Sequence, residues 1–378
     1  MKTHDVIVAG LGAMGAATAW HLARRGQRVL GLERFDIPHA MGSSHGTNRI
    51  IRLAYFEDPS YVPLLRRAYE LWRELEAAAG EPLLFVTGGV DAGPEDSRLV
   101  TGSLAACRAH GLPHEVVDAG ELARRYPGYR IPAGDVAVLQ PDAGFVMSER
   151  SIVAFAGLAL EAGADLRARE ALVSWEPTPG GGVRVRTTRG TYEAGRLVLS
   201  TGAWIGEHVP ALAGKAVPER QVLGWFQPRV PASFRLGAFP VGIVAHEGTH
   251  YYQFPVHGVP GFKLGVYHHL HERGPADTLS REPNEADEAL LRRALRAVFP
   301  DADGPTLALK TCLFTNTEDE HFVLDALPDA PQVLVASPCS GHGFKFATVI
   351  GEALADLVTR GATAHDLRLF SLARLSAG

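Results

Sequence analysis

Three glycines near the N-terminus have the spacing of a dinucleotide-binding loop. Gly10, Gly12 and Gly15 form the pattern G-x-G-x-x-G. The first glycine permits a tight turn, the second lets backbone N–H groups approach a pyrophosphate, and the third lets a helix pack closely on a sheet. The acid Glu33 follows about 20 residues later, where a carboxylate binds ribose hydroxyls and repels a 2′-phosphate. The motif predicts a bound dinucleotide and does not distinguish FAD from NAD.

The segment around these glycines has the order of elements that the motif requires. A β-branched strand is expected at residues 6–8, a helix at residues 16–25 and a second strand at residues 29–32. The helix N-terminus then faces the phosphates, and its unpaired N–H groups and dipole stabilise their negative charge. We therefore expect a Rossmann-like unit at the start of the chain.

Two later segments have the pattern of a buried strand that runs into a turn of small residues. The first ends in STGAW, with Gly202 and Trp204, and the second in SGHGFKF, with Gly341, Gly343 and Lys345. Glycines in such turns let the backbone pass close to a flat or phosphorylated ligand. The three turns predict a nucleotide-binding domain assembled from separated parts of the chain.

The segment GSSHGTNRIIR, residues 42–52, combines small residues with two arginines. Its glycines and serines predict a loop that runs close to a ligand. On a helical turn Arg49 and Arg52 would share one face. A solvated pair of arginines is the alternative interpretation.

The middle of the chain has a different texture. Residues 218–300 are rich in aromatics, prolines and histidines, and they predict a substrate-facing lobe of β-strands. The fold class is therefore α/β, with a Rossmann-like dinucleotide-binding domain and an interleaved antiparallel β-rich substrate domain (α+β). The expected dinucleotide-binding domain comprises residues 1–84, 146–216 and 321–378, and the substrate domain comprises residues 85–145 and 217–320.

Several further strands and helices are expected from periodicity and turn signals. The expected strands are residues 85–92, 242–245, 249–254, 262–267 and 333–336, and the expected helices are residues 61–79, 99–110, 148–161, 285–298 and 345–359.

Composition excludes several classes of protein. The chain has 378 residues, a formal net charge of −5 and three cysteines. It has no run of apolar residues long enough to span a membrane, and its charge is not that of a nucleic-acid-binding protein. Three cysteines do not suggest a disulfide framework, so a reducing cytoplasm is the expected location.

The local motifs GSSHGTNRIIR, YQFP, GFKLG, KTC and SGHGFKF occur in this order along the chain. Together with the opening motif they resemble the monomeric sarcosine oxidase and N-methyl-L-tryptophan oxidase family of flavin amine oxidases, over nearly the whole chain. The resemblance implies a monomer that uses FAD and O2 to oxidise a secondary amino acid. Its products are hydrogen peroxide and an imine, which hydrolyses to an aldehyde and a primary amino acid.

The resemblance also implies that FAD is covalently bound through a thioether to its 8α carbon. The matching residue is Cys312, and Cys339 is a rival on chemistry alone because it lies just before the last turn. The residues expected to contact the cofactor are Gly10, Gly12, Gly15, Glu33, Arg34, Ser43, Ser44, Arg49, Val173, Gly202, Trp204, Cys312, Gly341, Gly343 and Lys345.

The candidate catalytic residues follow from the same resemblance. Arg52 and Lys345 match the anchors of the substrate carboxylate, and Arg49 matches a basic residue close to the flavin. His45 lies in the same segment and is also a candidate.

Three residues further along the chain complete this set. Tyr252 and His268 match residues of the substrate pocket, and Lys263 matches the lysine that assists oxygen reduction. A positioned ammonium in a dry site would stabilise a superoxide-like anion. No metal ion is implied.

Three departures leave the size of the substrate open. Phe314 replaces a common tyrosine, Asn48 replaces a common threonine, and an extra residue, Val266, leaves open whether His268 or His269 faces the pocket. Adjacent strand residues face opposite ways, so only one of the two histidines is expected there. Sarcosine, a bulkier N-alkyl amino acid or a cyclic imino acid could be the substrate.

Three other functions are compatible with parts of this pattern. A flavin dehydrogenase that passes electrons to a quinone or a carrier protein would share the fold but would not need Lys263. A non-catalytic flavin-binding protein would need neither Cys312 nor the cationic residues. NAD dependence would leave the second and third turns without a task.

Overall fold

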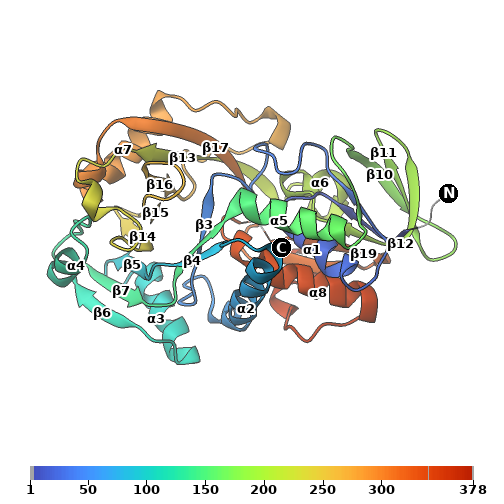
Figure 1. The fold of residues 1–378 in the computed structure, drawn as a ribbon, viewed down its shortest axis with the longest axis horizontal. Helices are drawn as coiled ribbons and strands as arrows, with labels where there is room; N and C mark the ends of the chain where they lie inside the picture. The colour runs from blue at the N-terminus through green and yellow to red at the C-terminus, as the bar shows by residue number, and fades with distance from the viewer. Residues whose placement is uncertain (1–3, 339, 377–378) are drawn as a thin grey trace.

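The first sheet joins strands from the beginning, the middle and the end of the chain. In the computed structural model, which describes residues 4–338 and 340–376, β1 (His4–Ala9) pairs in parallel with β2 (Val29–Leu32) and with β12 (Thr191–Leu199). β12 also pairs in parallel with β19 (Ala330–Ser337). The sheet lies at the right of Figure 1, and it confirms the expected Rossmann-like fold. Its other strands are β9 (Asp165–Arg167), β10 (Leu172–Pro177), β11 (Val183–Thr187) and β18 (Val323–Leu327).

Helices pack closely on this sheet because small residues line the contact. α1 (Ala13–Ala23) is rich in alanine and glycine and is buried along almost its whole length. A Cβ at Gly15 would lie 1.7 Å from the carbonyl oxygen of Gly10, so only glycine allows the helix to follow the strand this closely. The helix begins three residues earlier than its hydrophobic pattern predicts. The other helices of this part are α2 (Val62–Ala79), α5 (Ser148–Glu161), α6 (Ile205–His208) and α8 (Ala347–Arg360).

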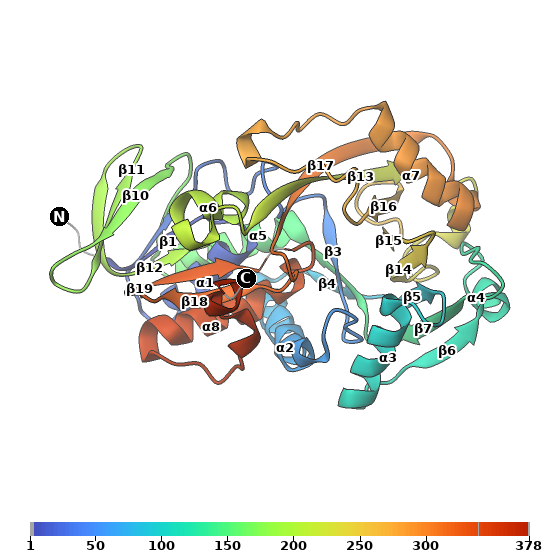
Figure 2. The same ribbon diagram turned by 180° about the vertical axis from the view of Figure 1, so that it is seen from behind.

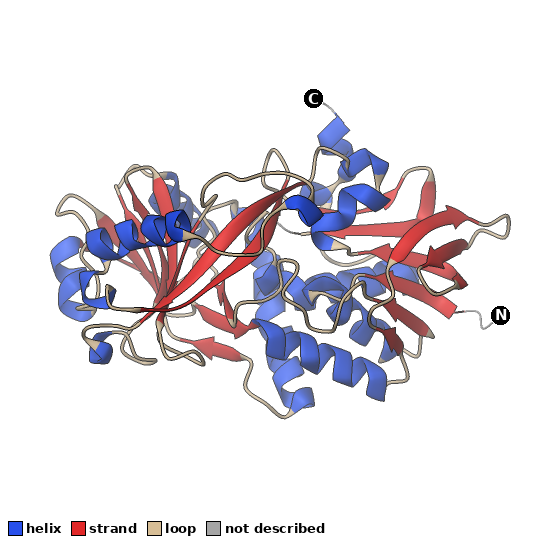
Figure 3. Cartoon of the chain, turned by 90° about the horizontal axis from the view of Figure 1, so that it is seen from above, coloured by secondary structure: helices blue, strands red, loops and turns tan. Residues whose placement is uncertain are grey.

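The second sheet forms the left side of Figure 1, and strands gather toward both ends of the molecule in Figure 3. Its neighbours pair in antiparallel fashion, except that β14 and β5 are parallel. In spatial order its strands are β17 (Thr306–Asn316), β13 (Val217–Phe226), β16 (Phe262–Val266), β15 (Thr249–Phe254), β14 (Val241–His246), β5 (Gly89–Gly93), β7 (Val136–Gln140) and β6 (Glu115–Asp118). The helices beside this sheet are α3 (Arg98–His110), α4 (Ala119–Arg125) and α7 (Glu285–Val298).

One predicted strand is wrong. Residues 85–92 form two strands, β4 (Leu84–Val86) and β5, which belong to different sheets. Gly88 separates them with a φ of 75°, a backbone conformation that turns the chain out of its extended path. β4 instead joins a three-stranded sheet with β3 (Asn48–Ile51) and β8 (Gly144–Met147). Within the described stretches, no helix is long and apolar enough to cross a membrane.

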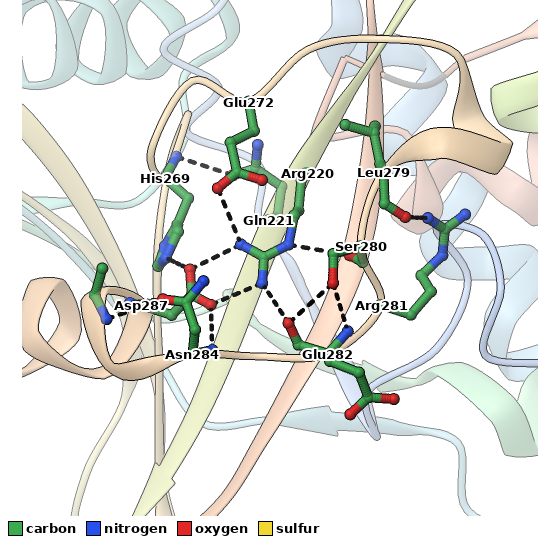
Figure 4. Close-up of polar contacts among 11 residues, drawn as sticks. Arg220, Gln221, His269, Glu272, Leu279, Ser280, Arg281, Glu282, Asn284 and Asp287 are labelled. Carbon is green, nitrogen blue, oxygen red and sulfur yellow. Dashed lines mark hydrogen bonds and ion pairs between the residues drawn. The ribbon is translucent and has the colours of Figure 1, made fainter.

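Residues 267–284, the crossing segment, connect β16 to α7 and contact residues that follow β2 and β12 of the first sheet. Ala276 packs there against Trp204 and Leu313, and Figure 2 shows the segment above β17 and β13. Arg220 of β13 holds the end of the crossing segment that leads into α7. Its guanidinium donates to the carbonyl oxygens of Ser280 and Glu282, at 3.0 Å each, as Figure 4 shows.

The same guanidinium forms a buried ion pair. It donates two hydrogen bonds, of 2.8 and 2.7 Å, to the carboxylate of Asp287, and both side chains are almost wholly buried. His269 contacts the same carboxylate through Nε2 at 2.9 Å. The network therefore fixes the crossing segment to the second sheet.

We predict that Arg220→Ala lowers the free energy of unfolding by about 3–5 kcal/mol, because it leaves the Asp287 carboxylate buried without its partner. Urea unfolding followed by circular dichroism measures the change. Arg184→Ala, which removes two surface ion pairs of β11, is the control and should have little effect. Equal losses in the two variants would contradict the role of the buried pair.

Candidate active site

A cavity of about 510 Å³ lies between the first and second sheets. It contacts all three predicted turns, and it also contacts strands β15 and β17 of the second sheet. Of the residues predicted to contact the cofactor, those that line it are Gly10, Gly12, Glu33, Arg34, Ser43, Ser44, Arg49, Val173, Gly202, Trp204, Cys312, Gly341, Gly343 and Lys345. Gly15 lies beneath the lining, where it permits the approach of α1 to β1.

One end of the cavity has the features of a nucleotide site. The Glu33 carboxylate is held by the backbone, because it accepts hydrogen bonds from the N–H groups of Leu11 at 2.7 Å and Phe35 at 3.0 Å. Arg34 pairs with Asp277 of the crossing segment at 2.9 Å, and Asp277 also accepts a hydrogen bond from Trp204 Nε1 at 2.8 Å. The sequence did not predict Asp277 as a residue of this site, because no local motif surrounds it and it belongs to a segment distant in sequence from the nucleotide end of the cavity.

The residues at this end fit a dinucleotide. The side-chain oxygens of Ser43 and Thr201 are buried and lack a hydrogen-bond partner among the described residues, and both residues line the cavity. The first turn of α1 follows Gly12, which provides no side-chain cap. Free hydroxyl donors next to a helix N-terminus suit phosphate oxygens.

The other end of the cavity combines a thiol with cations. Cys312 of β17 is 2% exposed. Burial raises the pKa of its thiol, while the positive charges of Arg49, Lys263 and Arg281 oppose this rise. Among the described residues, Cys107 is a second free thiol, and it is absent from the cavity lining. Cys339 lies outside the described residues.

Arg49 and Arg52 do not share a face on a helical turn, because the segment forms strand β3. Arg49 lines the cavity and donates to the carbonyl oxygens of Ser43 and Asn48, at 2.9 Å each. Arg52 follows the strand, is 2% exposed and does not line the cavity. Lys345 lines the cavity and Arg52 lies just outside its lining, where its charge still acts on Lys345; their shared role as anchors of the substrate carboxylate stays a prediction.

A buried carboxylate explains the position of Arg52. Its guanidinium donates to both oxygens of Glu57, at 2.9 and 2.8 Å, and to the Ala54 carbonyl oxygen at 2.7 Å. It also lies over the rings of Tyr55 and Phe56, at 4.6 and 4.7 Å. Such a paired arrangement is strong when desolvated. Glu57 was missed in the sequence, where it is one acid in a mixed surface-like stretch.

Lys345 lies in the third turn, just before α8. Its ammonium donates to the His342 carbonyl oxygen at 2.7 Å. Burial, followed by the positive charge of Arg52, lowers the pKa of Lys345 to about 7. The His342 ring contacts Tyr55 and the Glu320 carbonyl oxygen, and burial lowers the pKa of His342 to about 4. The turn therefore presents a neutral imidazole beside a titratable ammonium.

Strand β16 places Tyr267 in the cavity, and neither predicted histidine lines it. Phe262, Leu264 and Val266 belong to the core of the second sheet. Since strand side chains alternate, the opposite face carries Lys263 and Gly265 and leads to Tyr267, which lines the cavity. The Tyr252 ring of β15 also lines the cavity. This ring packs against Gly265, where a Cβ would lie 2.2 Å from it.

His268 lies outside the cavity lining and is hydrogen-bonded elsewhere, and its role as a pocket residue stays a prediction. Its ring lies between the carboxylates of Glu219 and Glu320, at 3.0 Å from each. These two hydrogen bonds raise the pKa of His268 to about 9. His269 is buried against Asp287. Continued alternation from Lys263 would have identified Tyr267 from the sequence.

His268 also belongs to a cluster with the composition of a metal site. Ligand atoms of Glu219, His268 and His271 lie within 4.8 Å of one another. The Glu219 carboxylate already accepts hydrogen bonds from Arg273 at 2.7 Å and Asn316 at 2.9 Å. The charges of the cluster are therefore balanced by protein groups.

Lys263 and His45 lie behind the cavity wall. Neither lines the cavity. The Lys263 ammonium donates to Gly46 and Asn48, and His45 is buried with an unpartnered Nε2. Burial, together with the nearby Arg49, lowers the pKa of His45 to about 4.

Comparison with known proteins agrees with this geometry. Residues 5–357 match the family described as FAD dependent oxidoreductase. The chain is 43% identical to monomeric sarcosine oxidase of Streptomyces avermitilis, over 99% of this chain and 98% of that protein. It is 35% identical to N-methyl-L-tryptophan oxidase of Salmonella gallinarum, over 99% of both chains.

Among solved structures, it is similar to NikD, an unusual amino acid oxidase essential for nikkomycin biosynthesis. The TM-score is 0.84 and the identity 26%, over 98% of both chains. These similarities cover nearly the whole chain. The chain therefore belongs to the FAD dependent oxidoreductase family, as a relative of the monomeric sarcosine oxidases and N-methyl-L-tryptophan oxidase.

Proposed function

We propose that this protein is an FAD-dependent oxidase of secondary N-alkyl amino acids, which uses O2 as its electron acceptor. One observation carries the proposal: a single cavity joins a dinucleotide end to an end with a buried thiol and two cations, in a chain 43% identical to a sarcosine oxidase along its length. Bound FAD would supply the two-electron chemistry. The substrate loses two electrons and two protons to become an imine, and O2 gains them to become H2O2.

The residues of the cavity have distinct tasks in this reaction. Lys345 binds the substrate carboxylate through its ammonium. Lys345 and Arg49 also lower the pKa of the substrate amine, because positive charges disfavour its protonated form. The rings of Tyr252 and Tyr267, 5.2 Å apart between centroids, exclude water beside the amine. Water then hydrolyses the imine to an aldehyde and a primary amino acid.

Cys312 is the residue that would hold FAD covalently. It lines the cavity, and the positive charges of Arg49, Lys263 and Arg281 oppose, but do not outweigh, the rise that burial causes in the pKa of its thiol. Arg49, Arg34 and the turn glycines would bind the remainder of the cofactor.

Oxygen uptake distinguishes the oxidase from a dehydrogenase. With sarcosine, N-methyl amino acids, proline and pipecolate as a panel, we expect one mole of H2O2 per mole of O2 consumed for at least one member. Reduction of a quinone or dye without peroxide would indicate the dehydrogenase instead. A flavin that no member reduces under anaerobic conditions would overturn the proposed substrate class.

Acid precipitation tests the covalent link. In the wild-type protein the yellow colour should stay with the pellet, and in Cys312→Ala it should pass into the supernatant, because the thioether is lost. Cys107→Ala, another buried thiol, is the matched control and should behave like wild type. Release from Cys339→Ala in place of Cys312→Ala would assign the link to the other cysteine.

The pKa of Lys345 predicts how carboxylate affinity varies with pH. A lysine whose pKa is about 7 is positively charged below that pH and neutral above it. The affinity for acetate, which has no amine, should therefore fall as the pH rises above about 7. A hydrogen bond to a charged group is worth roughly 1.5–3 kcal/mol, so the loss should be about 10- to 100-fold.

Titration of flavin absorbance with acetate measures this affinity. Lys345→Met should bind acetate weakly at every pH, while Lys215→Met, which alters an exposed lysine, should retain the wild-type profile. An unchanged profile in Lys345→Met would remove Lys345 from carboxylate binding.

A further inference from the structure

Lys263 is surrounded by oxygen atoms that carry no charge. The residue is 1% exposed. The three N–H groups of its ammonium donate to the carbonyl oxygens of Gly46 and Asn48, at 2.8 and 2.7 Å, and to Asn48 Oδ1 at 2.8 Å. The rings of Phe254 and Trp225 cover it, at 4.1 and 5.6 Å from their centroids. All three donors are therefore satisfied by neutral groups. Three acceptors around one nitrogen require the protonated amine, so this geometry opposes the lowering of the pKa of Lys263 by burial.

In the part of the chain that the structure describes, Lys263 forms no ion pair. A nearby carboxylate, Glu149, is occupied by other donors: it accepts hydrogen bonds from the N–H groups of Gly46 and Thr47 and from the Ser148 hydroxyl. Arg49, the next residue after Asn48, adds a second positive charge. Other buried cations of this protein, Arg52 and Arg220, have a carboxylate partner.

Asn48 therefore has an unusual position. Its carbonyl oxygen accepts hydrogen bonds from both Lys263 and Arg49, and its side chain provides the third acceptor for Lys263. An amide oxygen can hold an ammonium in place without cancelling its charge. In a poorly hydrated interior, an uncancelled charge acts strongly on its surroundings even without direct contact.

We propose that Asn48 is a positioning residue for oxygen reduction, which holds Lys263 behind the cavity wall as an uncompensated positive charge. This inference rests on the proposed oxidase function. Oxygen takes up two electrons and two protons to leave as H2O2, and the first electron makes it a superoxide anion. A fixed positive charge stabilises that anion. Asn48 itself touches neither oxygen nor substrate.

Three substitutions at one position test this role. Asn48→Asp keeps the acceptor but adds a negative charge that cancels the ammonium. Asn48→Leu removes the acceptor without adding charge and leaves one buried N–H unpaired. Asn48→Thr, the residue often present here in the resembled family, keeps a neutral acceptor. Lys263→Met is the reference for complete loss of the charge.

The first measurement is the rate at which dithionite-reduced flavin in the holoenzyme is reoxidised by O2 in a stopped-flow instrument. We expect Lys263→Met to slow it about 100-fold. Asn48→Asp and Asn48→Leu should each slow it at least about 10-fold, and Asn48→Thr should stay within about threefold of wild type. No amine is used, so failure of the proposed substrate class would leave this result unaffected.

The second measurement is the midpoint potential of the flavin, which does not depend on turnover. Because a positive charge favours the electron-rich reduced form, Asn48→Asp and Lys263→Met should lower the potential, and Asn48→Thr should not. Wild-type reoxidation in Asn48→Leu or in Asn48→Asp would overturn the inference. An equal loss of reoxidation rate in Asn48→Thr and Asn48→Leu would also overturn it, because a neutral acceptor would then not contribute to the rate. Should Asn48→Asp fail to fold, the Asn48→Leu and Asn48→Thr pair decides alone.

Discussion

The parallel pairing of β12 and β19 beside β1 is the constraint on which the site depends. In parallel strands the carboxyl ends meet at one edge of the sheet, and ligands of open α/β sheets bind outside that edge. Here the three strands end in the glycine-bearing turns that line the cavity. Gly15 lets α1 follow β1 closely enough to aim its N-terminus at the same place. The second sheet then closes the opposite side with β15 and β17.

The buried cations of this protein fall into two groups, those that stabilise the fold and those that take part in the chemistry. Arg220 and Arg52 each have a buried carboxylate partner, which repays the cost of their desolvation. Lys345 and Lys263 have only neutral acceptors, and burial lowers the pKa of both. Perturbed, unpaired ionisable groups cluster at functional sites. Both lysines lie on or behind the wall of the cavity.

Features that depend on neighbouring residues could be predicted from the sequence. The opening βαβ unit, the helix over residues 285–298 and the convergence of three turns all follow from local glycine spacing and hydrophobic periodicity. The prediction of one strand over residues 85–92 was wrong because Gly88 turns the chain out of its extended path. Features that depend on distant partners were missed. Asp277 reaches the nucleotide end only through the crossing segment. The Arg52–Glu57 pair spans only five residues, but no sequence pattern marks that carboxylate as buried.

Tyr267 lies between these two cases. The alternation from Lys263 was available in the sequence, but the family resemblance assigned the neighbouring His268 to the pocket. The structure engages that histidine with Glu219 and Glu320 and leaves a phenol facing the cavity. Tyr267 therefore adds a phenol to the pocket residues that the motifs predict.

A crystal structure of the purified holoprotein is the most direct measurement of the central claim, that one cavity orders FAD from the nucleotide end to the thiol end. The account predicts the adenosine next to Glu33 and Val173, and the isoalloxazine next to Cys312, Arg49 and Lys345. A flavin bound in the reverse orientation, or outside this cavity, would contradict it.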